Sequence, residues 1–243
     1  MAMLLDRYLE HLTHEKRSSV HTVAAYRRDL QGFATYLSTE GVSAIEQADD
    51  QLVRLWMMKL MEEGQSARTV NRRLSAVRGF FRFARVTGSA ANDPTELIEA
   101  PKLQSRLPEF VPEKPMEQLF QREWPEGYEG IMHRCVMELL YGTGMRLAEL
   151  TGLRPGDVDE RASTIRVLGK RNKERILPIG DSLVETLRRF RAERTAAFGD
   201  EDRGIPLILG RTGKPLSRKS LQRLVQHYLG GVTSQRKRSP HVL

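Results

Sequence analysis

The chain has 243 residues, of which 40% are hydrophobic, enough apolar material for one large core or two modest ones. Its formal net charge of +8 predicts attraction to polyanions, nucleic acid first and anionic membrane second. The single cysteine, Cys135, excludes a disulfide framework and a cysteine metal site. No signal peptide and no apolar run of about twenty residues is visible, which indicates a soluble, cytoplasmic protein without a membrane span. We expect no membrane partner.

Apolar residues spaced by three and four in the first ninety positions predict four amphipathic helices joined by short breaks. Such a pattern is typical of a compact helical bundle. The four helices are expected near 3–16, from Ser18 or Ser19 to Gly41, from Asp49 or Asp50 to Gly64, and from Ser66 to Gly88.

The second and fourth of these helices begin with hydroxyl and cationic side chains, the set that commonly contacts DNA phosphates at helix N-termini. Arginines one turn further, such as Arg73 or Arg78, could reach base edges in a major groove. Basic residues gather in two runs that have no acidic residue, at 66–85 and at 211–238. Helix capping is the alternative explanation for Ser19 and Ser66, and a solvated surface is the alternative for the basic runs. The predicted DNA contacts are Ser19, Thr22, Tyr26, Arg27, Ser66, Arg68, Thr69, Arg72, Arg73 and Arg78, with Arg218 and Lys219 from a second run without acidic residues at 211–238.

Prolines recur between 92 and 112, which neither a helix nor a central strand sustains. We therefore expect a first domain at 1–105, a linker at 106–112 and a second domain at 113–243. In the second domain, the pattern predicts helices at 113–121, at 130–140, from a cap at Asp181 to about Phe198, and from a cap at Ser217 onward. It also predicts a hairpin at 164–178 and a short apolar stretch at 204–209.

Two cations of the second domain, Arg146 and Lys170, sit where the backbone changes direction, so that loop amides can assist them in binding a phosphate. A planar guanidinium grips two phosphate oxygens, and a lysine with a lowered pKa can protonate a leaving alkoxide. The alternative for Arg146 is a surface ion pair with Glu149. Gly169-Lys170 is not a Walker motif, because its glycine and hydroxyl spacing is wrong.

Several strings resemble the tyrosine recombinase (phage-integrase-like) family, and its Xer-type branch in particular. They are SVHTVAAYRRDL (19–30), SARTVNRRLSAVR (66–78), YGTGMRLAEL (141–150), GKRNKER (169–175) and SPHVL (239–243). Only Arg171 departs clearly, since the family pattern has glycine there. The resemblance implies a mainly α, two-domain DNA clamp. A four-helix SAM-like core-binding bundle would precede a mainly helical catalytic domain with a small antiparallel β-sheet.

The resemblance also implies a function, which is site-specific DNA recombination through a 3′-phosphotyrosyl intermediate, in chromosome-dimer resolution or integration, without metal or cofactor. Arg146, Lys170 and His241 would be catalytic, and His241 would open a His-x-x-Arg motif. The partner would be double-stranded DNA at a recombination site, bound as a tetramer by the full-length protein.

The motif's arginine and the nucleophilic tyrosine are expected beyond Leu243, because none of the six tyrosines falls where the nucleophile belongs. We therefore expect the chain to be a C-terminally truncated recombinase that binds DNA as a monomer without cutting it. Two alternatives are a non-catalytic DNA-binding protein with the same clamp and a metal-dependent nuclease or phosphotransferase. The nuclease is poorly supported, because the acidic residues lie mostly on helix faces away from the cation motifs.

Overall fold

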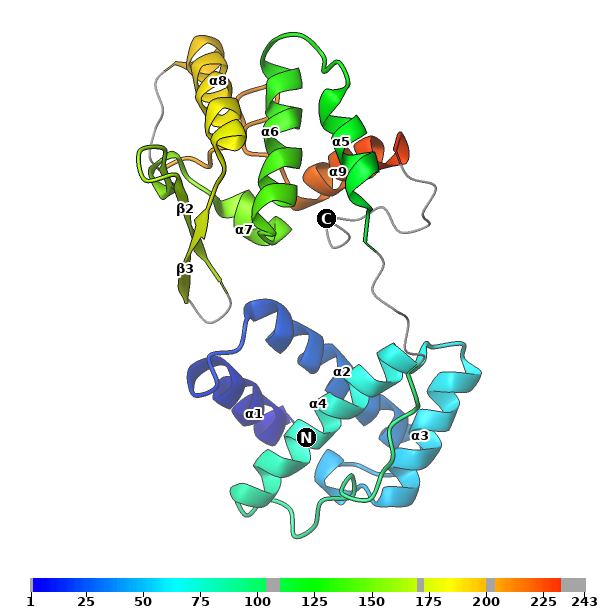
Figure 1. Cartoon of the computed structure of the whole chain (residues 1–243). Coiled ribbons are helices and arrows are strands. Elements are labelled where there is room, and N and C mark those ends of the chain that lie inside the picture. Colours follow the sequence, from blue (N-terminus) through cyan, green and yellow to red (C-terminus); the bar gives the residue numbers. More distant parts are fainter. Residues whose placement is uncertain (1, 104–109, 170–172, 200–203, 233–243) are drawn as a thin grey trace. The chain divides into compact units, whose positions relative to one another are not determined.

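The computed structural model describes residues 2–103, 110–169, 173–199 and 204–232. The chain divides into two compact units, Met1–Arg106 and Leu107–Leu243, here called the first and second units, each with its own hydrophobic core. Helices dominate both, and the described strands form one three-stranded antiparallel sheet (Figure 1). The expected mainly α fold with a small sheet is therefore confirmed. Among the described helices, none has the length and apolar character that crossing a membrane requires.

The first unit is a bundle of four helices, which lie where the apolar spacing predicted them. Side chains cap three of them: Ser19 accepts from Thr22 N–H, Asp49 from Leu52 N–H, and Ser66 from Thr69 N–H. The helices are α1 (Ala2–His14), α2 (Val20–Thr39), α3 (Asp50–Glu62) and α4 (Ala67–Val86), with a 3₁₀ turn, η1 (Ile45–Gln47), between α2 and α3.

Helix α4 is the centre of this bundle, since it packs against α1, α2 and α3. Its Phe80 and Phe81 are fully buried, and Phe80 meets Tyr8 of α1 edge-on at 5.9 Å between ring centroids. The helices come close here because α4 has a glycine, Gly79, directly under the Tyr8 hydroxyl, where a Cβ atom would collide with it.

The segment that follows α4 is bound back onto it. Arg78 donates a hydrogen bond to the carbonyl of Ile98, whose side chain is buried, and Asn71 Nδ2 donates to the carbonyl of Pro101 at 2.9 Å. The chain is thus fixed to the first unit up to Pro101. Val111 belongs to the second core, whereas residues 106–109 of the expected linker lie outside the described residues.

The second unit is built around α6, whose residues from Cys135 to Leu140 are all buried and which packs chiefly against α8 (Figure 1). The predicted central core helix is therefore present, and it extends further than expected in both directions. The elements are α5 (Glu113–Gln121), α6 (Gly127–Thr143), α7 (Leu147–Gly152), η2 (Pro155–Asp157), β1 (Val158–Asp159), β2 (Thr164–Leu168), β3 (Glu174–Pro178), α8 (Asp181–Phe198) and α9 (Arg218–Gly230).

The sheet has the order β1-β2-β3, and β2 places Ile165 and Val167 in the core. One expectation about a neighbouring segment was wrong. Gly180, not Asp181, is the N-cap of α8, and no side chain caps it. The sheet also has the short strand β1, which the hairpin prediction did not include, because two residues are too few to show an alternating pattern.

Candidate active site

Arg146 occupies the sharp turn between α6 and α7. Helix α6 ends at Thr143, and its C-cap residue, Gly144, adopts the left-handed conformation (φ 59°) and donates its N–H to the Leu140 carbonyl at 3.1 Å. The Met145 N–H then donates to Thr143 Oγ1 at 3.2 Å. Arg146 follows as the N-cap residue of α7, in an extended conformation. The Gly-Thr-Gly break thus places Arg146 where the backbone changes direction, as expected from the sequence, and also at the start of a helix that the sequence analysis did not predict.

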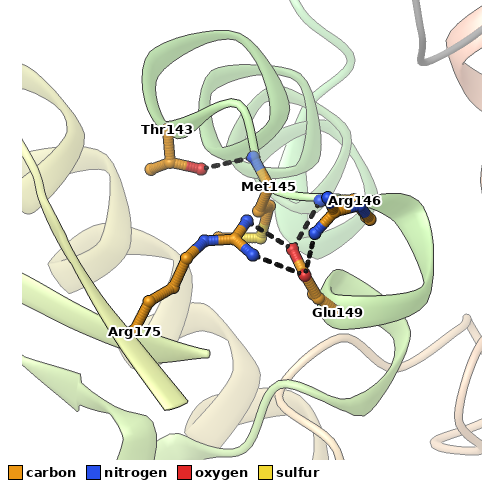
Figure 2. A network of polar contacts seen from close by, with 5 residues as sticks. All are labelled: Thr143, Met145, Arg146, Glu149 and Arg175. Atoms are coloured by element: carbon orange, nitrogen blue, oxygen red, sulfur yellow. Dashed lines mark hydrogen bonds and ion pairs between the residues drawn. The ribbon is translucent and has the colours of Figure 1, made fainter. Parts of the chain in front are cut away.

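A buried carboxylate holds this arginine in place. The Glu149 side chain is only 4% exposed, and it accepts from Arg146 N–H on Oε2 at 2.7 Å and from Arg146 Nη1 on Oε1 at 2.9 Å. Arg175 of β3 also donates to Glu149 with both terminal nitrogens, each at 2.8 Å (Figure 2). One carboxylate therefore joins two arginines that are 29 residues apart in the sequence.

The hydrogen bonds keep Glu149 ionised. Burial alone would raise its pKa, but the bond from the Arg146 backbone and those from the Arg175 and Arg146 side chains outweigh burial, so the pKa of Glu149 is lowered from its ordinary value. The Arg146 guanidinium stays 63% exposed at its side chain. The centre therefore has two positive charges and one negative, with the more exposed guanidinium available to an anion.

The ion pair that stood as the alternative for Arg146 does exist, but it is not a pair of solvated surface groups, since Glu149 is buried and shared with Arg175. Sequence reasoning did not single out Arg175. A signal was present: Arg175 lies directly opposite Val167 in the hairpin, and opposite residues of an antiparallel pair share one face. Because Val167 is buried, that register would have directed Arg175 to the core side.

The other two predicted catalytic residues, Lys170 and His241, lie outside the described residues. The base of the hairpin turn is described. Gly169 N–H donates to the Lys173 carbonyl at 2.8 Å, which continues the β2–β3 pairing beyond Leu168 and Glu174.

Some of the predicted DNA contacts in the first unit already have partners within the unit. Arg72 bonds the buried carboxylate of Asp29, and Arg73 lies 4.0 Å from the same group, while Arg27 pairs with Asp6 at 3.1 Å. Burial raises the pKa of Asp29, and the nearby Arg72 opposes that shift. Arg78, which was expected to reach a base edge, donates to the Ile98 carbonyl, so holding the chain after α4 is a role that the sequence did not reveal.

The remaining predicted contacts lie mostly at helix starts. Ser19 and Ser66 do cap α2 and α4, as the alternative reading held, and each also shares a hydrogen bond of 2.9 Å with the threonine three residues on, Thr22 or Thr69. Tyr26 is half-buried against the first core. Arg68, Arg218 and Lys219 are exposed on the first turns of α4 and α9.

Two of the three tyrosines of the second unit use their hydroxyls in hydrogen bonds within it. Tyr128 donates to the Leu209 carbonyl at 3.0 Å, and burial raises the pKa of Tyr128 to about 12. The Tyr228 hydroxyl shares a 2.9 Å hydrogen bond with His133 Nδ1, and burial raises its pKa as well. Tyr141 stacks obliquely on Phe120.

Within the ranges that the structure describes, no group of three or more histidine, cysteine, aspartate or glutamate side chains is placed to hold a metal ion. The carboxylate nearest to Arg146, that of Glu149, is occupied by guanidinium and amide donors.

The two units match two protein families in sequence. Residues 5–88 match the phage integrase N-terminal SAM-like domain, and residues 109–243 match the phage integrase family itself. These matches and the fold define a two-domain protein of the integrase type. The chain belongs to the phage integrase family of tyrosine recombinases.

The curated relatives of this chain indicate which branch of the family it resembles most. It is 32% identical to the tyrosine recombinase XerD of Staphylococcus haemolyticus over 243 residues, which cover all of this chain and 82% of that protein. It is 34% identical to XerD of Staphylococcus aureus strain N315, with the same coverage. The resemblance to the Xer-type branch is therefore confirmed.

Solved structures share the fold. A lambda integrase (75–356) dimer bound to a COC′ core site superposes with a TM-score of 0.73 at 18% identity, over all of this chain and 83% of that one. XerH bound to its difH substrate in a pre-cleavage complex gives 0.70 at 16% identity, over all of this chain and 71% of that one.

Proposed function

We propose that the protein performs site-specific DNA recombination, by strand cleavage and rejoining through a 3′-phosphotyrosyl intermediate. The observation that carries the proposal is the Arg146 centre, in which an exposed guanidinium at a helix start is oriented by a buried, ionised carboxylate. Membership of the tyrosine recombinase family supplies the reaction class. Orientation by a fixed partner suits Arg146 to neutralising the nonbridging oxygens of a phosphodiester as charge develops on them.

The chemistry needs three further groups. A tyrosine oxygen attacks phosphorus, the bond from phosphorus to the 5′ oxygen breaks, and a proton passes to that oxygen. We assign to Lys170 the donation of the proton to the leaving 5′ oxygen. We assign to His241 either a contact with a phosphate oxygen or a proton transfer. The phosphodiester is exchanged for a phosphotyrosine ester, so rejoining requires neither hydrolysis nor an external energy source.

None of the six tyrosines of this chain is proposed as the nucleophile. Tyr8 and Tyr36 are buried in the first core and Tyr26 lies against it, while Tyr128 and Tyr228 use their hydroxyls in bonds within the second unit. Tyr141 is 37% exposed, but it lies in the string that resembles the first catalytic arginine motif, which is not where the family has its nucleophile. We therefore expect a polypeptide of residues 1–243 to bind DNA without becoming linked to it. This is also what the second candidate function, a non-catalytic DNA-binding protein, predicts for that polypeptide.

The DNA partner is proposed to be a specific duplex site contacted by both units. In the first unit the contacts would come from the starts of α2 and α4, and in the second from Arg218 and Lys219 at the start of α9. XerH and lambda integrase have been solved on DNA, the latter also as a tetramer on a Holliday junction. By analogy we propose four copies on DNA, in chromosome-dimer resolution or integration, and a monomer without DNA, since a charge of +8 opposes self-association.

The test begins by selecting a binding site. Residues 1–243 are used to select duplexes from random-sequence DNA, and a selected duplex is nicked near its centre so that cleavage releases a short fragment and traps a covalent complex. The product of the complete gene should form that complex, which survives denaturation and is lost on protease digestion. If the selected site is bound tightly but never becomes joined to the protein, the recombinase function is wrong and the non-catalytic DNA-binding function is favoured.

The decisive variant is Arg146→Ala. It should lower the rate of covalent complex formation by about 100-fold or more, the usual effect of removing one stabilising donor, while DNA binding persists. Because Arg175 still pairs with Glu149, the change does not leave a buried carboxylate unpaired. Arg161→Ala is the matched control, since Arg161 is an exposed arginine of the same unit outside the predicted DNA contacts. Equal rates for the two variants would contradict the assignment of Arg146.

A further inference from the structure

Arg175 is bound firmly to the Arg146 centre, although no role in the proposed reaction has yet been assigned to it. It reaches from β3 and grips Glu149 with two parallel bonds, Nη1 to Oε1 and Nη2 to Oε2, both 2.8 Å long (Figure 2). This bidentate geometry is the strongest and most directional form of an arginine–carboxylate pair. The Arg175 side chain is 36% exposed, against 63% for Arg146, so it lies deeper in the fold.

The chain makes room for this side chain at Gly169. A Cβ atom on Gly169 would lie 3.4 Å from Arg175 Nη1, 3.2 Å from the Lys173 carbonyl oxygen and 3.7 Å from Glu149 Oε1. The end of β2 therefore lies directly over the Arg175–Glu149 pair. A glycine at this point allows the hairpin and the Arg146 turn to approach each other around one carboxylate.

The charges of the three side chains explain what Arg175 contributes. Each oxygen of Glu149 accepts two bonds, one from Arg146 and one from Arg175. If Arg146 were the only cation, the carboxylate would neutralise it fully, and a buried pair of this kind holds its partner strongly. With Arg175 present, the centre keeps a net positive charge, and Arg146 keeps donors and charge for an anion.

We propose that Arg175 is a positioning residue for Arg146: through its fork on Glu149 it fixes the carboxylate that orients Arg146 and supplies the charge that leaves Arg146 able to bind the scissile phosphate. The inference rests on the proposed recombinase function. It assigns Arg175 no contact with DNA.

The first measurement is the rate of single-turnover covalent complex formation by the product of the complete gene on the selected, nicked duplex. Arg175→Gln should slow this step by about 10- to 100-fold, the effect expected of a misplaced catalytic group. DNA affinity should change by no more than about twofold, as for a residue outside the interface. Arg166→Gln is the matched control, because Arg166 lies on the neighbouring strand β2 and pairs with Asp157 instead of Glu149.

A neutral substrate separates positioning from a merely structural role. A methylphosphonate at the cleaved position replaces one nonbridging oxygen by methyl and removes the charge that Arg146 neutralises. The defects of Arg175→Gln and Arg146→Ala should therefore shrink together on this substrate. A variant that only loosened the fold would show the same defect on both substrates, and that result would overturn the proposal.

The charge argument predicts a rescue. In Arg175→Gln/Glu149→Gln the negative charge beside Arg146 is gone, while the amide oxygen at position 149 can still accept a hydrogen bond from Arg146 and orient it. The double variant should therefore react faster than Arg175→Gln alone. A double variant as slow as the single one, or slower, would overturn the inference.

If Arg175→Gln fails to fold, as judged by circular dichroism, the rate of Arg175→Lys is compared with that of Arg166→Lys instead. Arg175→Lys keeps the charge but loses the fork, and a rate below that of Arg166→Lys is expected.

The two proposals fail in different ways. If the wild-type protein forms no covalent complex on a DNA that it binds, the recombinase function is wrong and this inference goes with it. If the wild-type protein reacts and Arg175→Gln reacts as fast as Arg166→Gln, the recombinase function stands and the role of Arg175 is wrong.

Discussion

Several arginines that were expected to contact DNA are also paired with a carboxylate or carbonyl within the protein. Arg72 and Arg73 share Asp29, Arg78 holds the carbonyl of Ile98, and Arg146 shares Glu149. A guanidinium has five donors in a rigid fork, so it can bind a carboxylate or carbonyl with some of them and a phosphate with others. A pairing within the protein is therefore compatible with a DNA contact, and it also fixes the direction from which that contact is made.

The buried Glu149 leads to a prediction about pH and stability. Because its pKa is lowered in the folded state, Glu149 stabilises the fold above the unfolded-state pKa of about 4.5, and this stabilisation is lost as the pH falls through the folded-state value. Glu149→Gln should cost about 1–3 kcal/mol of unfolding free energy at pH 7, as expected when buried donors lose a charged acceptor. The difference between wild type and variant should shrink as the pH is lowered below about 4.5.

Urea unfolding between pH 7 and pH 3.5 measures this difference. The chain has one tryptophan in each unit, so a Trp56→Phe background leaves Trp124 to report on the second unit alone. The unit-specific probe matters because Asp29 of the first unit has a raised pKa, and its contribution therefore changes with pH in the opposite direction. A difference that stays constant across the pH range would contradict an ionised, stabilising Glu149.

At the level of helices, the close approach of α1 and α4 depends on one glycine. A Cβ atom at position 79 would collide with the buried Tyr8 hydroxyl, whereas a Cβ atom at Gly32 of α2 would meet nothing within 4 Å. Gly79→Ala should therefore destabilise the first unit by about 1–3 kcal/mol through overpacking. Gly32→Ala should stabilise it by about 0.5–1 kcal/mol, because alanine loses less backbone entropy in a helix.

The two variants form a matched pair, since both add one methyl group inside a helix of the same unit. Urea unfolding followed by Trp56 fluorescence in a Trp124→Phe background reports on that unit, because Trp56 packs on Phe33 with ring centroids 4.7 Å apart. If Gly79→Ala proves as stable as Gly32→Ala, Tyr8 moves aside without cost and the close packing of the helices is not set by Gly79.

Local sequence signals predicted most of the longer elements, but not the short α7 and β1 and not the ends of α6. The apolar spacing located α1 to α4, the serines at 19, 66 and 217 cap helices as expected, and the glycine break before Arg146 produced the turn that it predicted. Pairings between distant residues were not predicted. Arg72 meets Asp29 across 43 positions and Arg175 meets Glu149 across 26. Such contacts depend on how helices and strands pack, which no local pattern encodes.

The molecule as a whole carries its charge on two separately folded units, each with exposed arginines. Arg68 begins α4 in the first unit, and Arg218 begins α9 in the second. If both contact phosphates of one duplex, each contact displaces condensed counterions, and the affinity must fall with salt by an amount set by the number of contacts. The whole chain should then show a steeper salt dependence than the contacts of either unit alone would produce.

The last prediction concerns this salt dependence. Arg68→Ala and Arg218→Ala should each reduce the slope of log Kd against log salt concentration by about 1, and the double variant by about 2, because each removes one phosphate contact. Arg161→Ala changes the net charge equally at an exposed site outside the predicted interface, so its slope should match the wild type. Fluorescence anisotropy with the selected duplex between about 50 and 200 mM salt covers the range in which such slopes are measured. A slope that is altered by Arg68→Ala but not by Arg218→Ala would mean that only the first of these two arginines contacts a phosphate. Equal changes of slope in all three variants would mean that the salt dependence reflects net charge alone and not phosphate contacts.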